Sequence, residues 1–159
     1  MIETFGVYMI ENGWNIECNE RQGEYLPETI IKRYKNIPKQ WREFIGGIKC
    51  MMSSDDTTWF LCAEDFVTQS DEAFQWNEWE LLSLESSEDD TKWQNEIRKF
   101  WDNHLPIVMS VKGCYSYYAI AIKDGSIVHG SEPEFEECEI VAPSFMYFME
   151  KIVKGEIQL

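Results

Sequence analysis

Residues 113–130, GCYSYYAIAIKDGSIVHG, contain two alternating runs that are joined by an Asp-Gly pair. Alternation is typical of a β-strand, because successive side chains of a strand point to opposite faces of a sheet. The pair Asp124-Gly125 accepts the positive φ angles of a tight primed turn. We therefore expect residues 115–123 and 126–130 to be antiparallel neighbours in a sheet. The Tyr-rich hairpin is interpreted as scaffold and not as a site of chemistry.

Three further strands are expected outside this hairpin. TTWFLC at residues 57–62 is rich in β-branched and aromatic residues, and the Asp55-Asp56 pair before it is typical of a turn. IVMSV predicts a strand that begins at Ile107. A short strand is expected between residues 14 and 18.

Five segments are expected to be helices, because their apolar residues recur with helical spacing or follow a helix-start residue. Gly46-Gly47 should end the second helix, since glycine accepts the left-handed cap conformation without steric cost. Ser144 is the expected N-cap of the last helix, and Gly155 is positioned to stop it. The expected helices are residues 27–35, 38–45, 71–84, 90–103 and 144–155.

The helix expected at residues 90–103 has a strongly apolar face. Trp93, Ile97, Phe100 and Trp101 fall at positions i, i+4, i+7 and i+8, which lie on one side of a helix. We expect all four side chains to be buried against the sheet.

Length and composition limit the fold class. A chain of 159 residues with 44% hydrophobic and 14% aromatic residues has too much apolar surface to stay unfolded, and it has the size of one domain. With the expected elements, this predicts a single domain in which helices pack on a sheet. Residues 1–24 show no clean period and are expected to be an N-terminal extension that packs on a domain formed by residues 25–159.

Motifs of catalysis and of ligand binding are missing from the sequence. It contains no GxxxxGK phosphate loop, no GxGxxG, no HExxH and no GxSxG. His104 and His129 are the only histidines. His104 is expected to satisfy carbonyl groups at a helix C-terminus, and His129 has no triad partner that the sequence identifies. We expect no catalytic, cofactor-binding or metal-binding residue.

Cysteine usage and the absence of a targeting segment favour a cytoplasmic protein. The cysteines are widely spaced and form no CxxC pair, so we interpret them as small buried hydrophobic residues in a reducing compartment. The N-terminus lacks the basic start and apolar core of a secretory signal, and the longest apolar stretch, residues 140–149, is too short to span a membrane. The cysteines are Cys18, Cys50, Cys62, Cys114 and Cys138.

The chain is strongly acidic, with 29 Asp and Glu residues against 14 Lys and Arg residues and a formal net charge of −15. Nucleic acid is a poor partner, because phosphates are bound by neutralising them with basic side chains. The densest basic stretch, residues 32–42, is expected to supply the solvated faces of two short helices. An acidic field favours rapid association with a basic partner. Alternatively, the acidity only keeps the protein soluble.

The most concentrated acidic stretch is EPEFEECE at residues 132–139. If this segment is extended, Glu132, Glu134 and Glu136 share one face and Phe135 lies on the other. Such a strip would suit the docking of a basic surface. Alternatively, the segment is a solvated edge or loop, and charges on an edge strand also discourage aggregation. The candidate partner-binding residues are Asp55, Asp56, Glu132, Glu134, Glu136 and Glu137.

Several segments occur in an order that is informative: IPKQWREFIGG, WFLCAEDF, FWDNHLPI, YYAIAIKDGSIVH and VAPSFMYFMEKI. In this order they resemble the SMI1/KNR4 family, also called the SUKH superfamily. The resemblance implies a single α+β domain with a mixed, mainly antiparallel sheet backed by helices, and no shared catalytic machinery. Many bacterial members resemble immunity proteins that neutralise toxins, frequently nucleases, and fungal members are similar to regulators of cell-wall synthesis. The chain departs from the family pattern at a short loop, SVKGC, where Cys114 stands in place of a common acidic residue.

Charge and resemblance together favour an immunity protein that occupies the basic cleft of a cognate toxin. A non-catalytic interaction module in cellular regulation is the alternative, and it would bind a partner without protecting a cell from a toxin. A small enzyme would instead need a pocket with a perturbed carboxylate beside His104 or His129.

Overall fold

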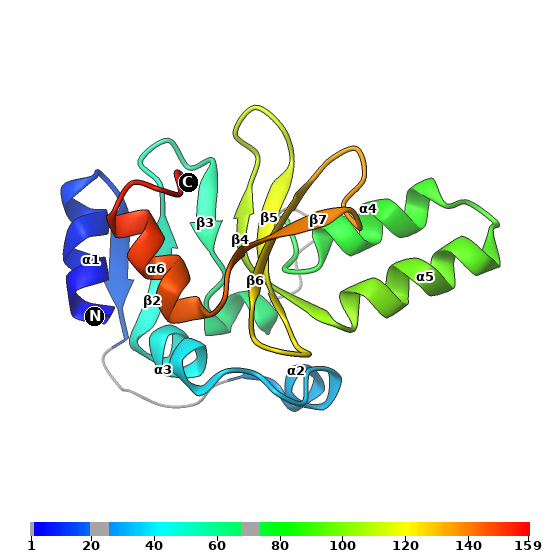
Figure 1. Ribbon diagram of the computed structural model, residues 1–159, viewed down its shortest axis with the longest axis horizontal. Helices are drawn as coiled ribbons and strands as arrows, with labels where there is room; N and C mark the ends of the chain where they lie inside the picture. The colour runs from blue at the N-terminus through cyan, green and yellow to red at the C-terminus, as the bar shows by residue number, and fades with distance from the viewer. Residues whose placement is uncertain (1, 20–25, 68–73) are drawn as a thin grey trace.

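A seven-stranded sheet runs through the middle of the protein (Figure 1). In the computed structural model, which describes residues 2–19, 26–67 and 74–159, the strands lie side by side in sequence order and every pairing is antiparallel. The predicted α+β class is confirmed, whereas a mixed sheet is not found among the described strands. The strands are β1 (Asn15–Cys18), β2 (Ile48–Met52), β3 (Thr58–Phe60), β4 (His104–Ser110), β5 (Ser116–Ala121), β6 (Ile127–Ser131) and β7 (Cys138–Ala142).

Helices cover both faces of this sheet. They are α1 (Ile2–Glu11), α2 (Glu28–Arg33), α3 (Lys39–Gly47), α4 (Glu78–Ser86), α5 (Thr91–Trp101) and α6 (Phe145–Val153), with a short 3-10 helix, η1 (Ala63–Phe66). α6 crosses in front of the sheet beside α1 and above α3, while α4 and α5 project from the opposite end of the molecule as an antiparallel pair (Figure 1). Strands in the centre of the sheet are therefore buried on both sides, and residues 105–109 of β4 are almost inaccessible to solvent.

The strand register separates the side chains of the two faces. Phe60, Val108 and Tyr118 are directly opposite one another in β3, β4 and β5, so their side chains share a face. Phe60 contacts Phe5 of α1, and Tyr118 contacts Phe148 of α6, with ring centroids 5.9 and 4.9 Å apart. This face supports α1, α3 and α6.

The next row of residues lies on the other face, which supports α4 and α5. Met109, Tyr117 and Gly130 are paired across β4, β5 and β6. The ring of Tyr117 packs against Trp101 of α5, at 4.9 Å between centroids, and it also lies over Gly130. Gly130 has no side chain because the ring of Tyr117 occupies that space: a Cβ there would lie 2.5 Å from the phenol oxygen.

The hairpin of β5 and β6 is confirmed, but its predicted two-residue primed turn is wrong. Gly125 has a positive φ of 77°, whereas Asp124 does not have one. The backbone N–H of Ala121 donates to the carbonyl of Ser126, which leaves four residues in the loop. Asp124 instead accepts hydrogen bonds from the N–H and hydroxyl of Ser126, because an Asp side chain readily binds the backbone two residues ahead.

Several predicted helix boundaries need correction. α3 continues through Gly46 and Gly47, and neither residue has a positive φ, because extended backbone follows directly at Ile48. α4 begins at Glu78 and not at residue 71; residues 71–73 of that prediction lie outside the described ranges. The last helix is confirmed, with a Ser144 cap as expected.

Other predictions about the strands and the N-terminus have mixed outcomes. The strand expected from Ile107 begins earlier, at His104, and accommodates Pro106 at an irregularity in the β4–β5 register. The short strand between residues 14 and 18 is confirmed as β1. Residues 2–11 form a helix that the sequence pattern did not predict; its Phe5 is fully buried in the common core.

Two predictions about surface residues are wrong. Only Cys62 of the five cysteines is buried, and Cys18, Cys114 and Cys138 are exposed. Within the basic stretch, Arg33 is not a solvated side chain, because it forms ion pairs with Glu80 and Asp102 in α4 and just after α5 (see below).

Gly130→Ala should lower the free energy of unfolding by about 1–3 kcal/mol, because overpacking forces buried neighbours to move. Urea denaturation followed by circular dichroism measures the change. Gly6→Ala is the matched control: no described atom outside the neighbouring backbone lies within 4 Å of a Cβ at that position in α1. Because alanine favours a helix interior, this control should be neutral or more stable. Unchanged stability of Gly130→Ala would contradict the role given to Tyr117.

Candidate functional site

The candidate partner-binding residues lie at one end of the sheet. Consecutive antiparallel strands place the β2–β3 turn, the β4–β5 turn and the loop of residues 132–137 at the same end, which is the upper end in Figure 1. Asp55 and Asp56 belong to the first turn, and the four candidate glutamates belong to the loop. The first turn and the loop are four strand spacings apart, or about 19 Å. The structure therefore places the candidates on one end but in two separate groups.

Asp55 has a structural role in its turn. Its carboxylate accepts hydrogen bonds from the hydroxyl groups of Ser53 and Thr57, both at 2.7 Å. These hydrogen bonds lower the pKa of Asp55 to about 2. Lys112, from the β4–β5 turn, lies 4.0 Å away. Asp56 follows with a φ of 55°, so the predicted turn is confirmed, and Asp55 is largely committed to holding it.

Residues 132–137, called loop 132–137 below, form turns and not an extended segment. The strip of alternating glutamates required an extended segment and is not formed, and the alternative of a loop is the one found. Glu132 exchanges hydrogen bonds with Tyr115: its N–H donates to the Tyr115 carbonyl at 2.8 Å, and its carboxylate accepts from the Tyr115 N–H at 2.9 Å. Glu136 accepts from the indole N–H of Trp101 at 2.8 Å. Two of the predicted docking residues thus attach the loop to the protein.

The loop is also held through Phe135. The hydroxyl of Tyr117 donates to the carbonyl of Phe135 at 2.5 Å. The Phe135 ring stacks on Trp79 of α4 with centroids 5.4 Å apart, and Trp79 also stacks on Tyr115 at 4.8 Å. Contacts from the start of β5 and from two helices therefore hold the loop in place.

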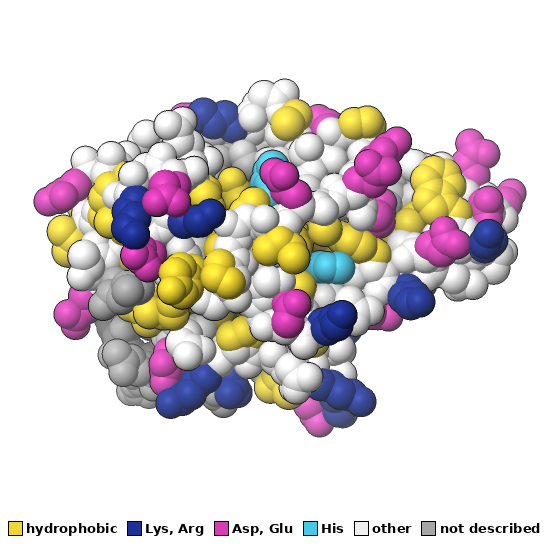
Figure 2. Space-filling model, viewed as in Figure 1, with side chains coloured by type: hydrophobic (Ala, Val, Ile, Leu, Met, Phe, Trp, Pro, Cys, Tyr) yellow, Lys and Arg dark blue, Asp and Glu magenta, His cyan; other side chains and the backbone are white. Residues whose placement is uncertain are grey.

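A groove lies between this loop and the two projecting helices, and it is called the α4–α5 groove below. Its volume is about 330 Å³, and it is lined by Leu82, Ser83 and Ser86 of α4, Trp93 of α5 and residues 133–137. Figure 2 shows Asp and Glu side chains around hydrophobic ones at this end of the molecule, where Lys or Arg side chains are also present; other basic side chains lie along the lower edge and at the left. Glu134 and Glu137 are exposed at the groove, so their charges are available to a partner.

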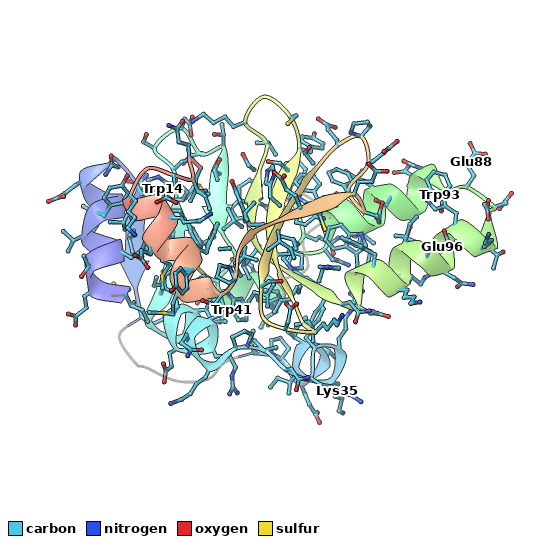
Figure 3. The ribbon with its side chains drawn as sticks, viewed as in Figure 1. Trp14, Lys35, Trp41, Glu88, Trp93 and Glu96 are labelled. Carbon is cyan, nitrogen blue, oxygen red and sulfur yellow. The ribbon has the colours of Figure 1, made fainter. Side chains whose placement is uncertain are left out.

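Sequence reasoning placed Trp93 in the core, and this prediction is wrong. Ile97 and Trp101 on the same helix face are buried as expected, but Trp93 is 45% exposed. Trp93 lies eight residues before Trp101, or about 12 Å along the helix axis. At the position of Trp93, α5 lies beyond the edge of the sheet. Figure 3 shows the labelled Trp93 near the tip of the helix pair. Helical spacing shows which residues share one face of a helix. It does not show how far the sheet that packs against this face extends.

An ion-pair network fixes the two helices that form the groove. The guanidinium of Arg33, at the end of α2, donates two hydrogen bonds to the carboxylate of Glu80 in α4, at 2.7 and 2.9 Å. The same guanidinium donates to Asp102, just after α5, at 2.8 Å. Glu80 is buried, so these hydrogen bonds compensate for removing its carboxylate from water. The network ties α2 to both members of the projecting pair.

Glu80→Ala should reduce the free energy of unfolding by about 3 kcal/mol, because the mutation leaves a partly buried guanidinium without its main partner. Glu28→Ala, which removes an exposed pair with Lys32 on α2, should cost less than about 0.5 kcal/mol. Chemical denaturation of both variants gives the comparison. Similar costs for the two substitutions would show that the network does not stabilise the helix pair.

The two histidines lie on opposite faces of the sheet. They pair with Ala121 and Tyr118 of β5, which are an odd number of residues apart. His104 caps α5 as predicted: its Nδ1 lies 2.8 Å from the carbonyl of Phe100, and its ring stacks on Phe100 at 4.1 Å. His129 packs against the ring of Tyr118 at 4.7 Å. This arrangement gives no shared site to the pair.

Burial lowers the pKa of His104 below its ordinary value of 6.5. The unfolded chain therefore binds a proton more readily than the folded protein, so the free energy of unfolding should fall as pH decreases through about 6.5. His104→Gln should show a smaller decrease between pH 7 and pH 5 than the wild type. Thermal or urea unfolding at several pH values tests this, and equal pH dependence of the two proteins would contradict it.

The described residues contain neither a metal-binding cluster nor a helix that could span a membrane. In the described ranges, no three His, Cys, Asp or Glu side chains are grouped so that they could hold a metal ion. None of the helices in those ranges is both long enough and apolar enough to cross a membrane. Comparisons with protein-family models, curated proteins and solved structures find no match to this chain.

Proposed function

We propose that this protein is a non-catalytic immunity protein that binds a basic toxin domain, most simply a nuclease, and blocks its active site in the cytoplasm. The observation that carries the proposal is the α4–α5 groove, where the exposed carboxylates of Glu134 and Glu137 lie beside the exposed indole of Trp93. The order of sequence motifs that resembles the SUKH superfamily supports a toxin as the class of partner.

Blocking by charge complementarity requires no chemistry from this protein. A nuclease presents basic side chains to the phosphates of its substrate, and an acidic surface can compete for them. The net charge of −15 would accelerate the encounter, most strongly at low ionic strength. The attached position of loop 132–137 would limit the entropy that is lost on binding.

Co-expression with toxin domains encoded by the genes next to its own tests the proposal. Cells should survive, and the purified pair should form a complex that weakens as the salt concentration rises. The variant Glu134→Lys/Glu137→Lys should weaken this complex by at least about tenfold, because each substitution replaces attraction with repulsion at the interface. Isothermal titration calorimetry at low and physiological salt measures both effects.

A control with the same change of charge separates the groove from the general field. Glu11→Lys/Glu156→Lys alters two exposed glutamates near α1 and the C-terminus, far from the projecting helices in Figure 1. It should change the affinity by less than about threefold, through the long-range field alone. A complex without cell survival would favour the regulatory interaction module. The absence of both would reject the proposed partner.

A further inference from the structure

The α4–α5 groove combines an aromatic surface with a charged rim. All seven tryptophans of the chain are described by the structure, and Trp93 is the one that is largely exposed. Its indole faces a groove whose other walls are Leu82 of α4 and Pro133 and Phe135 of the loop. Exposed large apolar side chains in a polar rim are typical of an interaction site.

The charges around this surface indicate the chemistry of the occupant. Glu134, Glu136 and Glu137 line the groove, and none of the described Lys and Arg residues does. Figure 3 labels Glu88 and Glu96 near Trp93, at the tip of the helix pair. Lys92 is also nearby but is strongly exposed, and it pairs with Glu96 at 4.0 Å. The groove therefore suits a cation with a flat or apolar body.

The carboxylate of Glu136 is less available to a bound cation than those of Glu134 and Glu137. Its carboxylate already accepts the hydrogen bond from Trp101. Glu134 and Glu137 are exposed, and among the described residues their carboxylates have no hydrogen-bond or ion-pair partner. These two carboxylates, on the rim of the groove, are thus available to a cation that enters it.

We propose that the α4–α5 groove binds one arginine side chain of the partner, with its guanidinium on the indole of Trp93 and its charge neutralised by Glu134 and Glu137. Arginine fits better than lysine because its planar guanidinium stacks on an aromatic ring and can bind carboxylates with two parallel hydrogen bonds. A groove of about 330 Å³ holds one side chain and not a folded element. The inference rests on the proposed basic partner but can be tested without it.

A blocked peptide with one arginine between glycines is the probe, and the same peptide with citrulline, which has the shape of arginine but no charge, is its control. Titration is followed by NMR through the indole N–H resonances, with that of Trp93 assigned by its loss in Trp93→Phe. The arginine peptide should shift the Trp93 resonance with saturable millimolar affinity, and citrulline should not shift it at the same concentrations.

Three variants locate the binding. Trp93→Ala should weaken binding of the arginine peptide, detected by its effect on the backbone resonances of loop 132–137, by at least about fivefold, since it removes the stacking surface. Glu134→Gln/Glu137→Gln should weaken it by a similar factor. Tyr147→Ala removes an aromatic residue on α6 that is 56% exposed, and it should change the affinity by less than about twofold. Circular dichroism would establish that each variant is folded.

The outcomes separate this inference from the proposed function. Equal binding of arginine and citrulline peptides, or unchanged affinity in Trp93→Ala, would overturn the arginine site even if the protein rescues cells from a toxin. Specific arginine binding that depends on Trp93 would support the site even if co-expression with the toxin gives no rescue.

Discussion

The contact between Tyr117 and Gly130 is the interaction on which the functional end of the molecule depends. Because the glycine has no side chain, the phenol ring lies flat on the neighbouring strand and its hydroxyl reaches the carbonyl of Phe135. Phe135 in turn packs on Trp79, which connects the sheet, loop 132–137 and α4. The groove is therefore a consequence of how one row of the sheet is packed.

The acidic residues of this protein divide into two groups with different roles. Asp55, Glu80, Glu132 and Glu136 are bound to donors of the same chain and hold turns, helices and a loop in place. Glu134 and Glu137 are exposed and contribute to the external field. Replacing all candidate glutamates together would mix these roles, because loss of affinity could then reflect a displaced loop. Net charge alone does not separate the two groups, but the hydrogen bonds do.

Local sequence patterns predicted much of the fold for clear physical reasons. The β5–β6 hairpin follows from alternation and an Asp-Gly pair, and the last helix follows from Ser144 and its apolar spacing. Errors arose where the outcome depends on residues distant in sequence. Trp93 is exposed because its helix extends past the sheet. Within the candidate site, the acidic segment was identified as a feature, but the sequence left open whether it is extended or a loop.

The sequence by itself determined the class of the fold, the excess of negative charge and the absence of familiar catalytic motifs, because these follow from composition and from spacing of two to four residues. Only the tertiary structure decided which carboxylates are free and which indole is exposed. Those properties depend on contacts such as Trp101 with Glu136, 35 residues apart, and Tyr115 with Glu132, 17 residues apart. Such contacts form only when the strands and helices are packed together, so no local pattern encodes them.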